Sequence, residues 1–219
     1  MDRIIDAFAW PLKDPDWLTK LLIVALTLLI PIVGAINGLG WMLACLERLR
    51  AGEERLAPAN LRYIGRGFPL FVVNFVYILG VAVAAGLIYV PALIVAANQS
   101  QGQANPALLS LAVLLSLLAF SVATLGSLAL DFAMPSIVLA TDRGRIPGGL
   151  QVNAVLRTAR ANLSNTLIAG LMLIAASFVG SLGLVACGVG ILFSTAYALA
   201  MQAWKVRSFE IGSPAAKAA

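Results

Sequence analysis

The stretch KDPDWLTKLLIVALTLLIPIVG, residues 13–34, decides the fold of this chain. A charged, proline-stiffened beginning that carries Trp17 runs directly into an apolar segment. Eleven residues after Lys20 this segment meets Pro31, and Gly34 follows. As a helix, that distance is about 16 Å, roughly half of the ~30 Å hydrocarbon thickness of a bilayer. The stretch therefore raises one question, which is whether the chain crosses a membrane here or turns back within it.

Composition predicts the class of the fold. Of the 219 residues, 61% are hydrophobic and only 11% are charged, against roughly 25% charged in an ordinary soluble domain. Charged residues are absent from three windows, 21–46, 67–130 and 161–204, and a spanning helix needs about 20 apolar residues. Only helices and closed barrels satisfy every backbone group in lipid, and a barrel would show short alternating strands. The sequence therefore predicts an all-α, polytopic helical membrane bundle.

The same windows predict where the elements begin and end. A single integral membrane domain covers 1–207, and a tail follows at 208–219. Apolar residues recur near helical spacing within 141–160, as in a helix that lies in the membrane interface. The other predicted elements are an interfacial arm at 1–16, a broken or re-entrant first element at 17–46, a cytoplasmic segment at 47–66, and four full spans at 68–97, 107–140, 163–178 and 189–205.

Lysine and arginine concentrate on the cytoplasmic side of membrane proteins. Segments 47–66 and 141–160 hold five and four Arg, whereas the loops 98–106 and 180–188 hold neither Lys nor Arg. We therefore expect a multi-pass protein of the cytoplasmic (inner) membrane, with both loops outside and a cytoplasmic C-terminus.

The charge distribution also bears on the opening question. If residues 21–46 cross once, Arg3, Lys13 and Lys20 are left outside, but if the chain turns back near Pro31 all 15 Lys and Arg lie on one side. This asymmetry favours a re-entrant helical hairpin. The 26 uncharged residues of the window are too few for two full spans, so a single Pro-kinked span remains the alternative.

Side chains that carry out catalysis are scarce. The chain has no His, and it contains no HExxH, GxSxG, P-loop or paired-carboxylate pattern. Cys45 and Cys187 lie in different apolar windows, which favours two buried free thiols over a disulfide or a metal pair. We therefore expect no enzyme activity, no cofactor and no metal. Nucleic-acid binding is not expected either, because no folded soluble module presents a basic patch.

Asp131 is the strongest candidate for an ion or substrate path, because it ends a 64-residue uncharged window and ionisable residues inside membranes are usually functional. The alternative is that Asp131 lies at the cytoplasmic interface, where it pairs with an arginine such as Arg143. Three polar residues inside apolar runs, Asn37, Asn74 and Gln202, could line a cavity on the same path. The alternative for these three is hydrogen bonding between helices, worth ~1 kcal/mol each.

Small residues recur at the spacing that lets two helices approach closely. Gly34 and Gly38 form a GxxxG motif. Two further small pairs are Gly80 with Ala84 and Ala82 with Gly86. We expect these residues to pack helices within one chain, and contact between two chains is the alternative.

Basic residues on the predicted cytoplasmic face could bind anionic lipid headgroups at about 1 kcal/mol each. The candidates are Arg48, Arg50, Arg55, Arg157 and Arg160. The orientation rule by itself also explains their presence.

Several stretches resemble a known family of sequences. They are KDPDWLTKLL at 13–22, the LLIPIVG break at 28–34, ERLRAGEE at 47–54 and LVACGVGILFSTAYALAMQAW at 184–204. Through them the chain resembles the uncharacterised prokaryotic membrane proteins grouped as domain of unknown function 4013. The stretch MPSIVLATDRGRIPGGLQVNAVLRTARANLSN at 134–165 is similar to that family's interfacial helix before the last hairpin. More distantly, the architecture resembles the membrane domain fused to some glycerophosphodiester phosphodiesterases. The resemblance implies no known activity and no known functional residues.

Two classes of function remain. The first is an accessory, assembly or scaffold subunit that acts through helix–helix contacts in the lipid bilayer, with another membrane protein or a second copy as partner. The alternative is a small transporter or channel with a cavity near the broken first element, since Pro31, Gly34 and Asn37 resemble the unwound mid-depth backbone of transporters. We rank the first ahead, because Asp131 is shallow and ion-coupled carriers usually need a charge at the membrane centre.

Overall fold

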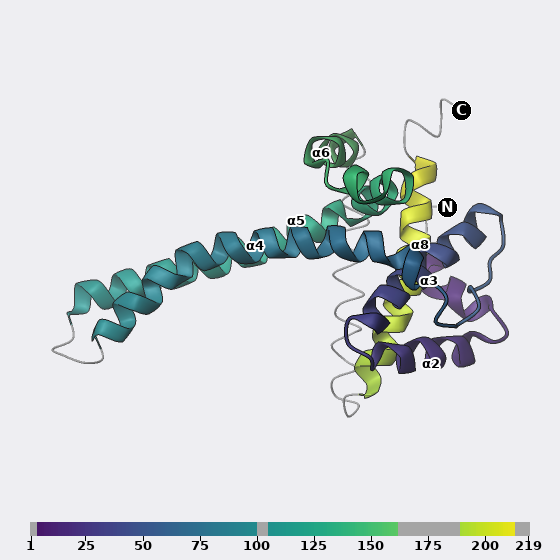
Figure 1. Ribbon diagram of the computed structural model, residues 1–219, viewed down its shortest axis with the longest axis horizontal. Coiled ribbons are helices and arrows are strands. Elements are labelled where there is room, and N and C mark those ends of the chain that lie inside the picture. The colour runs from purple at the N-terminus through teal and green to yellow at the C-terminus, as the bar shows by residue number, and fades with distance from the viewer. Residues whose placement is uncertain (1–3, 100–104, 162–188, 213–219) are drawn as a thin grey trace. The chain divides into compact units, whose positions relative to one another are not determined.

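The computed structural model describes residues 4–99, 105–161 and 189–212 of the chain. Every element in these ranges is helical and no strand occurs in them, which confirms the predicted all-α class. In chain order (Figure 1) the elements are α1 (Ile4–Ala9), the 3-10 helix η1 (Trp10–Lys13), α2 (Trp17–Leu28), α3 (Val33–Arg50), α4 (Ile64–Gln99), α5 (Pro106–Gly149), α6 (Val152–Ala161) and α8 (Val189–Gly212).

The chain divides into two compact units. One unit is residues 74–131, which take in the later part of α4 and the earlier part of α5. The other, called the main unit below, comprises residues 1–73 and 132–219. Its described helices are α1, η1, α2, α3, α6 and α8, together with the first part of α4 and the last part of α5.

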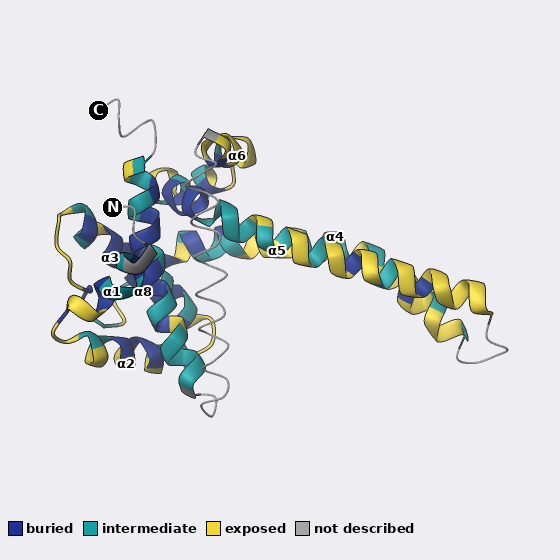
Figure 2. Ribbon diagram, turned by 180° about the vertical axis from the view of Figure 1, so that it is seen from behind, coloured by how far each residue is buried: buried dark blue, intermediate teal, exposed yellow. Residues whose placement is uncertain are grey.

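Helices α2, α3 and α8 pack against one another and form the core of the main unit. In α3 every residue from Trp41 to Leu46 is buried, as the dark blue of that helix in Figure 2 shows. Helix α8 buries the small side chains of Ala196, Ala200 and Ala203. Small side chains let helix backbones approach closely, so α8 can pack tightly against its neighbours α2 and α3.

The chain is interrupted between α2 and α3, at the place where Pro31 and Gly34 predict a break. The N–H of Val33 donates to the carbonyl of Pro31 at 2.6 Å across Ile32, whose φ of 61° and ψ of −62° are those of a strained γ-turn. Gly34 follows because a Cβ at that position would overlap the carbonyl oxygen of Thr27. Entry of this interrupted element into a membrane stays a prediction.

A loop at residues 51–63 lies against α3 and is held by side chains rather than by secondary structure. The indole N–H of Trp41 donates to the carbonyl of Ala57 at 3.0 Å. The carboxylate of Asp14 accepts from the backbone N–H of Leu56 at 2.8 Å. These bonds fix the path by which the chain leaves α3 and enters α4.

The 74–131 unit exposes apolar side chains along both of its helices. Leu87 and Phe120 are 73% and 71% exposed, and a Cβ on Gly126 would come within 2.7 Å of the Val81 side chain. Both α4 and α5 are long and apolar enough to cross a membrane, by length and composition.

Four full spans were expected, and the described chain supports two. The spans expected at 68–97 and 107–140 lie within α4 and α5, whereas the one at 163–178 falls outside the described residues. The span expected at 189–205 forms α8, but this helix is not apolar enough to count, because Gln202 and Lys205 interrupt its apolar sequence.

The segment at 141–160, expected as one interfacial helix, is shared by two helices. Helix α5 continues to Gly149 and is kinked at Arg145, whose φ is 51°. Helix α6 then places Val155 and Ala159 on a buried face and Arg157 on an exposed one. The amphipathic pattern is therefore present, but it belongs only to the second half of the segment.

Candidate functional site

Charged side chains from four helices meet in the main unit. Arg50 of α3 pairs with Asp142 of α5 at 2.7 Å and with Glu210 of α8 at 3.0 Å. Arg66, in the first turn of α4, pairs with Glu47 and lies 4.0 Å from Asp142. Two further ion pairs join Glu210 to Arg143 at 3.8 Å and to Arg207 at 3.0 Å. These seven residues are called the arginine cluster below.

Ion pairs lower the pKa values of two carboxylates of the cluster, Glu47 and Glu210. Burial by itself raises the pKa of Glu210, but hydrogen bonds from Arg50 and Arg207 outweigh burial and bring that pKa below its usual range. Burial likewise lowers the pKa of Arg50, and its hydrogen bonds to Glu210 and Asp142 reverse the effect. The pairing of Arg50 with Glu210 therefore favours the charged form of both groups.

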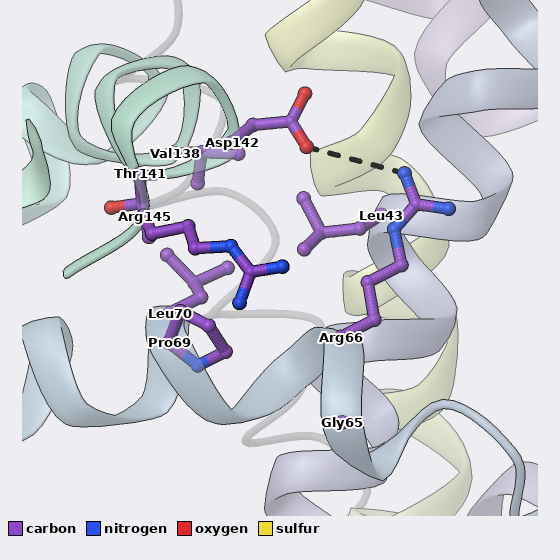
Figure 3. A pocket seen from close by; sticks show the side chains of 9 residues that line it. All are labelled: Leu43, Gly65, Arg66, Pro69, Leu70, Val138, Thr141, Asp142 and Arg145. Carbon is purple, nitrogen blue, oxygen red and sulfur yellow. Dashed lines mark ion pairs between the residues drawn. The ribbon is translucent and has the colours of Figure 1, made fainter.

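A cavity of about 150 Å³ opens beside the cluster (Figure 3). It is lined by one residue of α3, four of the first turns of α4 and four of the last turns of α5: Leu43, Gly65, Arg66, Pro69, Leu70, Val138, Thr141, Asp142 and Arg145. The guanidinium groups of Arg66 and Arg145 reach into it from different helices. The remaining lining residues are apolar or glycine, apart from Thr141 and Asp142.

Arg145 occupies an unusual backbone position. Its φ of 51° and ψ of −148° lie near a region that is almost restricted to glycine, and holding another residue there costs on the order of 1–3 kcal/mol. The guanidinium makes no ion pair or hydrogen bond with any residue in the described ranges. The kink at the end of α5 therefore directs an uncompensated positive charge toward the cavity.

The four polar candidates for an ion or substrate path fall in different places. Asn37 is fully buried, and its amide donates to the carbonyl of Asn60 at 2.9 Å and accepts from the N–H of Tyr63 at 3.2 Å. Both ends of this amide therefore hold the 51–63 loop. Asn74 and Asp131 are half-buried and belong to the 74–131 unit.

Gln202 lies in the main unit and lines a much smaller cavity of about 10 Å³ with Pro135, Val138 and Lys205. Its side-chain carbonyl oxygen is buried and accepts no hydrogen bond from the described residues. Asn37 and Gln202 therefore have separate surroundings, and the described main unit does not join them in one site.

Two of the five lipid-headgroup candidates make contacts within the main unit, and the other three are exposed. Arg48 donates to the carbonyl of Leu56 at 3.1 Å, and Arg50 belongs to the arginine cluster. Arg55, Arg157 and Arg160 are exposed. Headgroup binding stays a prediction for all five, and the geometry leaves the three exposed ones available for it.

The packing candidates behave differently in the two units. Gly34 and Gly38 lie at contacts in the main unit, where a Cβ on Gly38 would come within 2.9 Å of the Leu199 side chain. In the other unit, Gly80 and Gly86 have open space where a Cβ would point, and Ala84 is exposed. Helix packing through these three therefore stays a prediction that needs a further helix.

The sequence alone singled out none of the residues that line the cavity, including its two arginines, Arg66 and Arg145. In the sequence they counted only toward the orientation of the chain. A local signal did exist for Arg145, which stands after Gly144 and just before the helix-breaking run at 147–149. Across the described ranges, no group of three or more His, Cys, Asp or Glu residues could hold a metal ion.

Comparison with known proteins gives one match. The model of a family described as "Protein of unknown function (DUF4013)" matches residues 23–189, which is most of the chain. No curated protein and no solved structure matches it.

Proposed function

The chain belongs to the DUF4013 family of proteins of unknown function, and on that premise we propose that it is a multi-pass protein of the cytoplasmic membrane, acting as an accessory, assembly or scaffold subunit. In this proposal the 74–131 unit crosses the bilayer, the C-terminus lies in the cytoplasm, and the protein acts through helix–helix contacts without catalysis.

One observation carries the proposal, which is the exposed surface of α4 and α5. In the most apolar 18-residue windows of these helices, 6% and 11% of the residues are buried, whereas a core helix of a soluble protein is mostly buried. A contiguous apolar surface of this extent calls for lipid or another protein to cover it. Both helices satisfy their own backbone groups, as spanning segments must.

The surface of α4 also offers room for a further helix. Gly80 has open space around its missing side chain, and the exposed Ala84 lies one turn further along. Residues four apart lie on the same side of a helix, and small pairs at this spacing let two membrane helices approach closely. This supports helix contact with a partner or a second copy rather than enzymatic chemistry.

Purification in mild detergent followed by native mass measurement tests the role. We expect a stoichiometric membrane partner or a second copy to stay bound to the wild-type protein, and Gly80→Leu to release it because the added side chain separates the helices. Ile78→Leu is the control, since it alters an exposed position on the opposite side of α4 without adding side-chain volume. Release by the control as well would argue against contact through the Gly80 side.

The outcome that overturns this role is a lone monomer that conducts solutes. If the purified chain is monomeric in mild detergent, and proteoliposomes show a flux that Asp131→Asn abolishes, the transporter alternative replaces the scaffold proposal. The break near Pro31 would then be the place to look for the solute, although the amide of Asn37 is already engaged by the 51–63 loop.

A further inference from the structure

We propose that the cavity between Arg66 and Arg145 binds a phosphate group. Planar guanidinium groups bind phosphate through paired, charge-assisted hydrogen bonds. Here two of them reach into one cavity from the first turns of α4 and the last turns of α5 (Figure 3). The cavity of about 150 Å³ far exceeds the roughly 10–15 Å³ that a single water needs.

The charge around the cavity matches an anion. The arginine cluster together with Arg145 contains five guanidinium groups and three carboxylates, so two positive charges remain in excess. Asp142, the acid that lines the cavity, is already paired with Arg50 at 2.7 Å. The carboxylate of Asp142 is therefore already engaged, and the positive charge of Arg145 has no ion-pair partner among the described residues.

The backbone at Arg145 supports a ligand role rather than a structural one. A residue held at positive φ with no ion pair or hydrogen bond among the described residues gains nothing for the fold that glycine would not provide more easily. Such strained positions cluster at ligand clamps. The position is therefore better explained by what its guanidinium binds.

Two sources of phosphate suit this cavity, a lipid headgroup and a free soluble phosphate. Pro69, Leu70 and Val138 form an apolar wall that could accompany the glycerol end of a lipid, and the last turns of α5 belong to the predicted cytoplasmic face. The lipid source rests on the proposed membrane placement, whereas the soluble source does not.

Two measurements on the purified full-length chain test the site. Native mass spectrometry measures retention of phosphatidylglycerol against phosphatidylcholine, and calorimetric titration of the delipidated protein in detergent measures binding of inorganic phosphate. We expect Arg145→Gln to weaken whichever ligand binds by about tenfold, the loss of one charge-assisted interaction. Arg62→Gln is the matched control, because it removes the same charge from an exposed position that does not line the cavity.

A second variant separates ligand binding from folding. Arg145→Gly suits the positive φ of this position, so it should raise or preserve the thermal midpoint while weakening the ligand as strongly as Arg145→Gln does. A merely structural Arg145 would show the same ligand binding in both variants as in the wild type.

Each outcome of these measurements either supports or overturns the phosphate site. Preferential retention of phosphatidylglycerol that falls in both Arg145 variants supports the site with lipid as its source, and phosphate binding without lipid preference supports it with a soluble source. Binding of neither probe, or equal losses in Arg62→Gln and Arg145→Gln, overturns it. The phosphate titration needs no bilayer. It therefore tests the phosphate site even if the proposed membrane placement is wrong.

Discussion

At the scale of single residues, Asp14 shows how one buried carboxylate can organise two segments. Only 1% of this residue is exposed, yet its oxygens accept from the ammonium of Lys20 at 2.7 Å and from the backbone N–H groups of Asp16 and Leu56. It thereby joins the segment just before α2 to the 51–63 loop. A buried carboxylate with this many donors is stabilised in its charged form.

Replacing Asp14 should therefore destabilise the main unit. We expect Asp14→Ala to lower the free energy of unfolding by about 1–3 kcal/mol, because Lys20 and the N–H of Leu56 lose their acceptor in a buried place. Thermal unfolding in detergent measures the effect. The neighbouring Asp16 is exposed and its carboxylate caps nothing, so Asp16→Ala should change stability by less than about 0.5 kcal/mol. Equal losses in the two variants would contradict this account.

The Asp14 carboxylate should also make the stability of the fold fall at low pH. Burial raises the pKa of Asp14, but hydrogen bonds from Lys20, Asp16 and Leu56 outweigh burial and hold that pKa below its usual range. Its contribution is therefore fully present above the unfolded-state pKa of about 3.9 and is lost as the pH falls through the lower folded-state value. The stability difference between wild type and Asp14→Ala should shrink over that acid interval, as unfolding midpoints at successive pH values would show. A difference that stays constant there would contradict it.

At the scale of elements, α3 and the start of α4 approach each other backbone to backbone. A Cβ on Gly67 would overlap the carbonyl oxygen of Ile36, and one on Gly40 would overlap the carbonyl oxygen of Tyr63. Because backbone atoms cannot move aside as a flexible side chain can, both positions require glycine. This crossing holds the 51–63 loop closed and places Arg66 at its cavity.

Gly67→Ala should accordingly separate the two helices and cost about 1–3 kcal/mol of stability, as overpacking of a close contact does. Gly65→Ala provides the control in the same turn of α4, because the position has open space around it. There alanine should stabilise by up to about 1 kcal/mol through its higher helix propensity. Chemical or thermal unfolding of both variants would decide, and a neutral Gly67→Ala would mean that the crossing is looser than described.

At the scale of the whole molecule, the proposed orientation assigns each segment to one side of the membrane. The proposed placement puts Glu54 in the cytoplasm and the end of α4, near Asn98, outside. Both residues are exposed, so each can report on its surroundings as a single cysteine.

Labelling intact cells with a membrane-impermeant maleimide tests this placement, in a chain whose Cys45 and Cys187 are replaced by Ala. We expect Asn98→Cys to react and Glu54→Cys to be shielded until the cells are permeabilised, because Lys and Arg hold their segments inside. Permeabilised cells, in which both should react, are the control. A reactive Glu54→Cys together with a shielded Asn98→Cys would reverse the orientation.

The local sequence determined the helical class, the break near Pro31 and the two long apolar helices α4 and α5. Each of these depends on residues close together in the chain, such as an uncharged run long enough for a helix or a proline that removes a backbone donor. Two of the four expected spans are supported, because the one at 163–178 lies outside the described residues and α8 is not among the helices apolar enough to cross a membrane.

Only the tertiary structure decided how the polar residues are used. Arg50 and Glu210 are 160 residues apart yet form a hydrogen bond of 3.0 Å, and no local pattern could have paired them. From the sequence, Asn37 was a candidate either for a cavity or for a structural hydrogen bond, and in the structure its amide holds the backbone at Asn60 and Tyr63. Hydrophobic periodicity tells which side of a helix is apolar, but the partner of a charge or an amide depends on which distant segments fold against it.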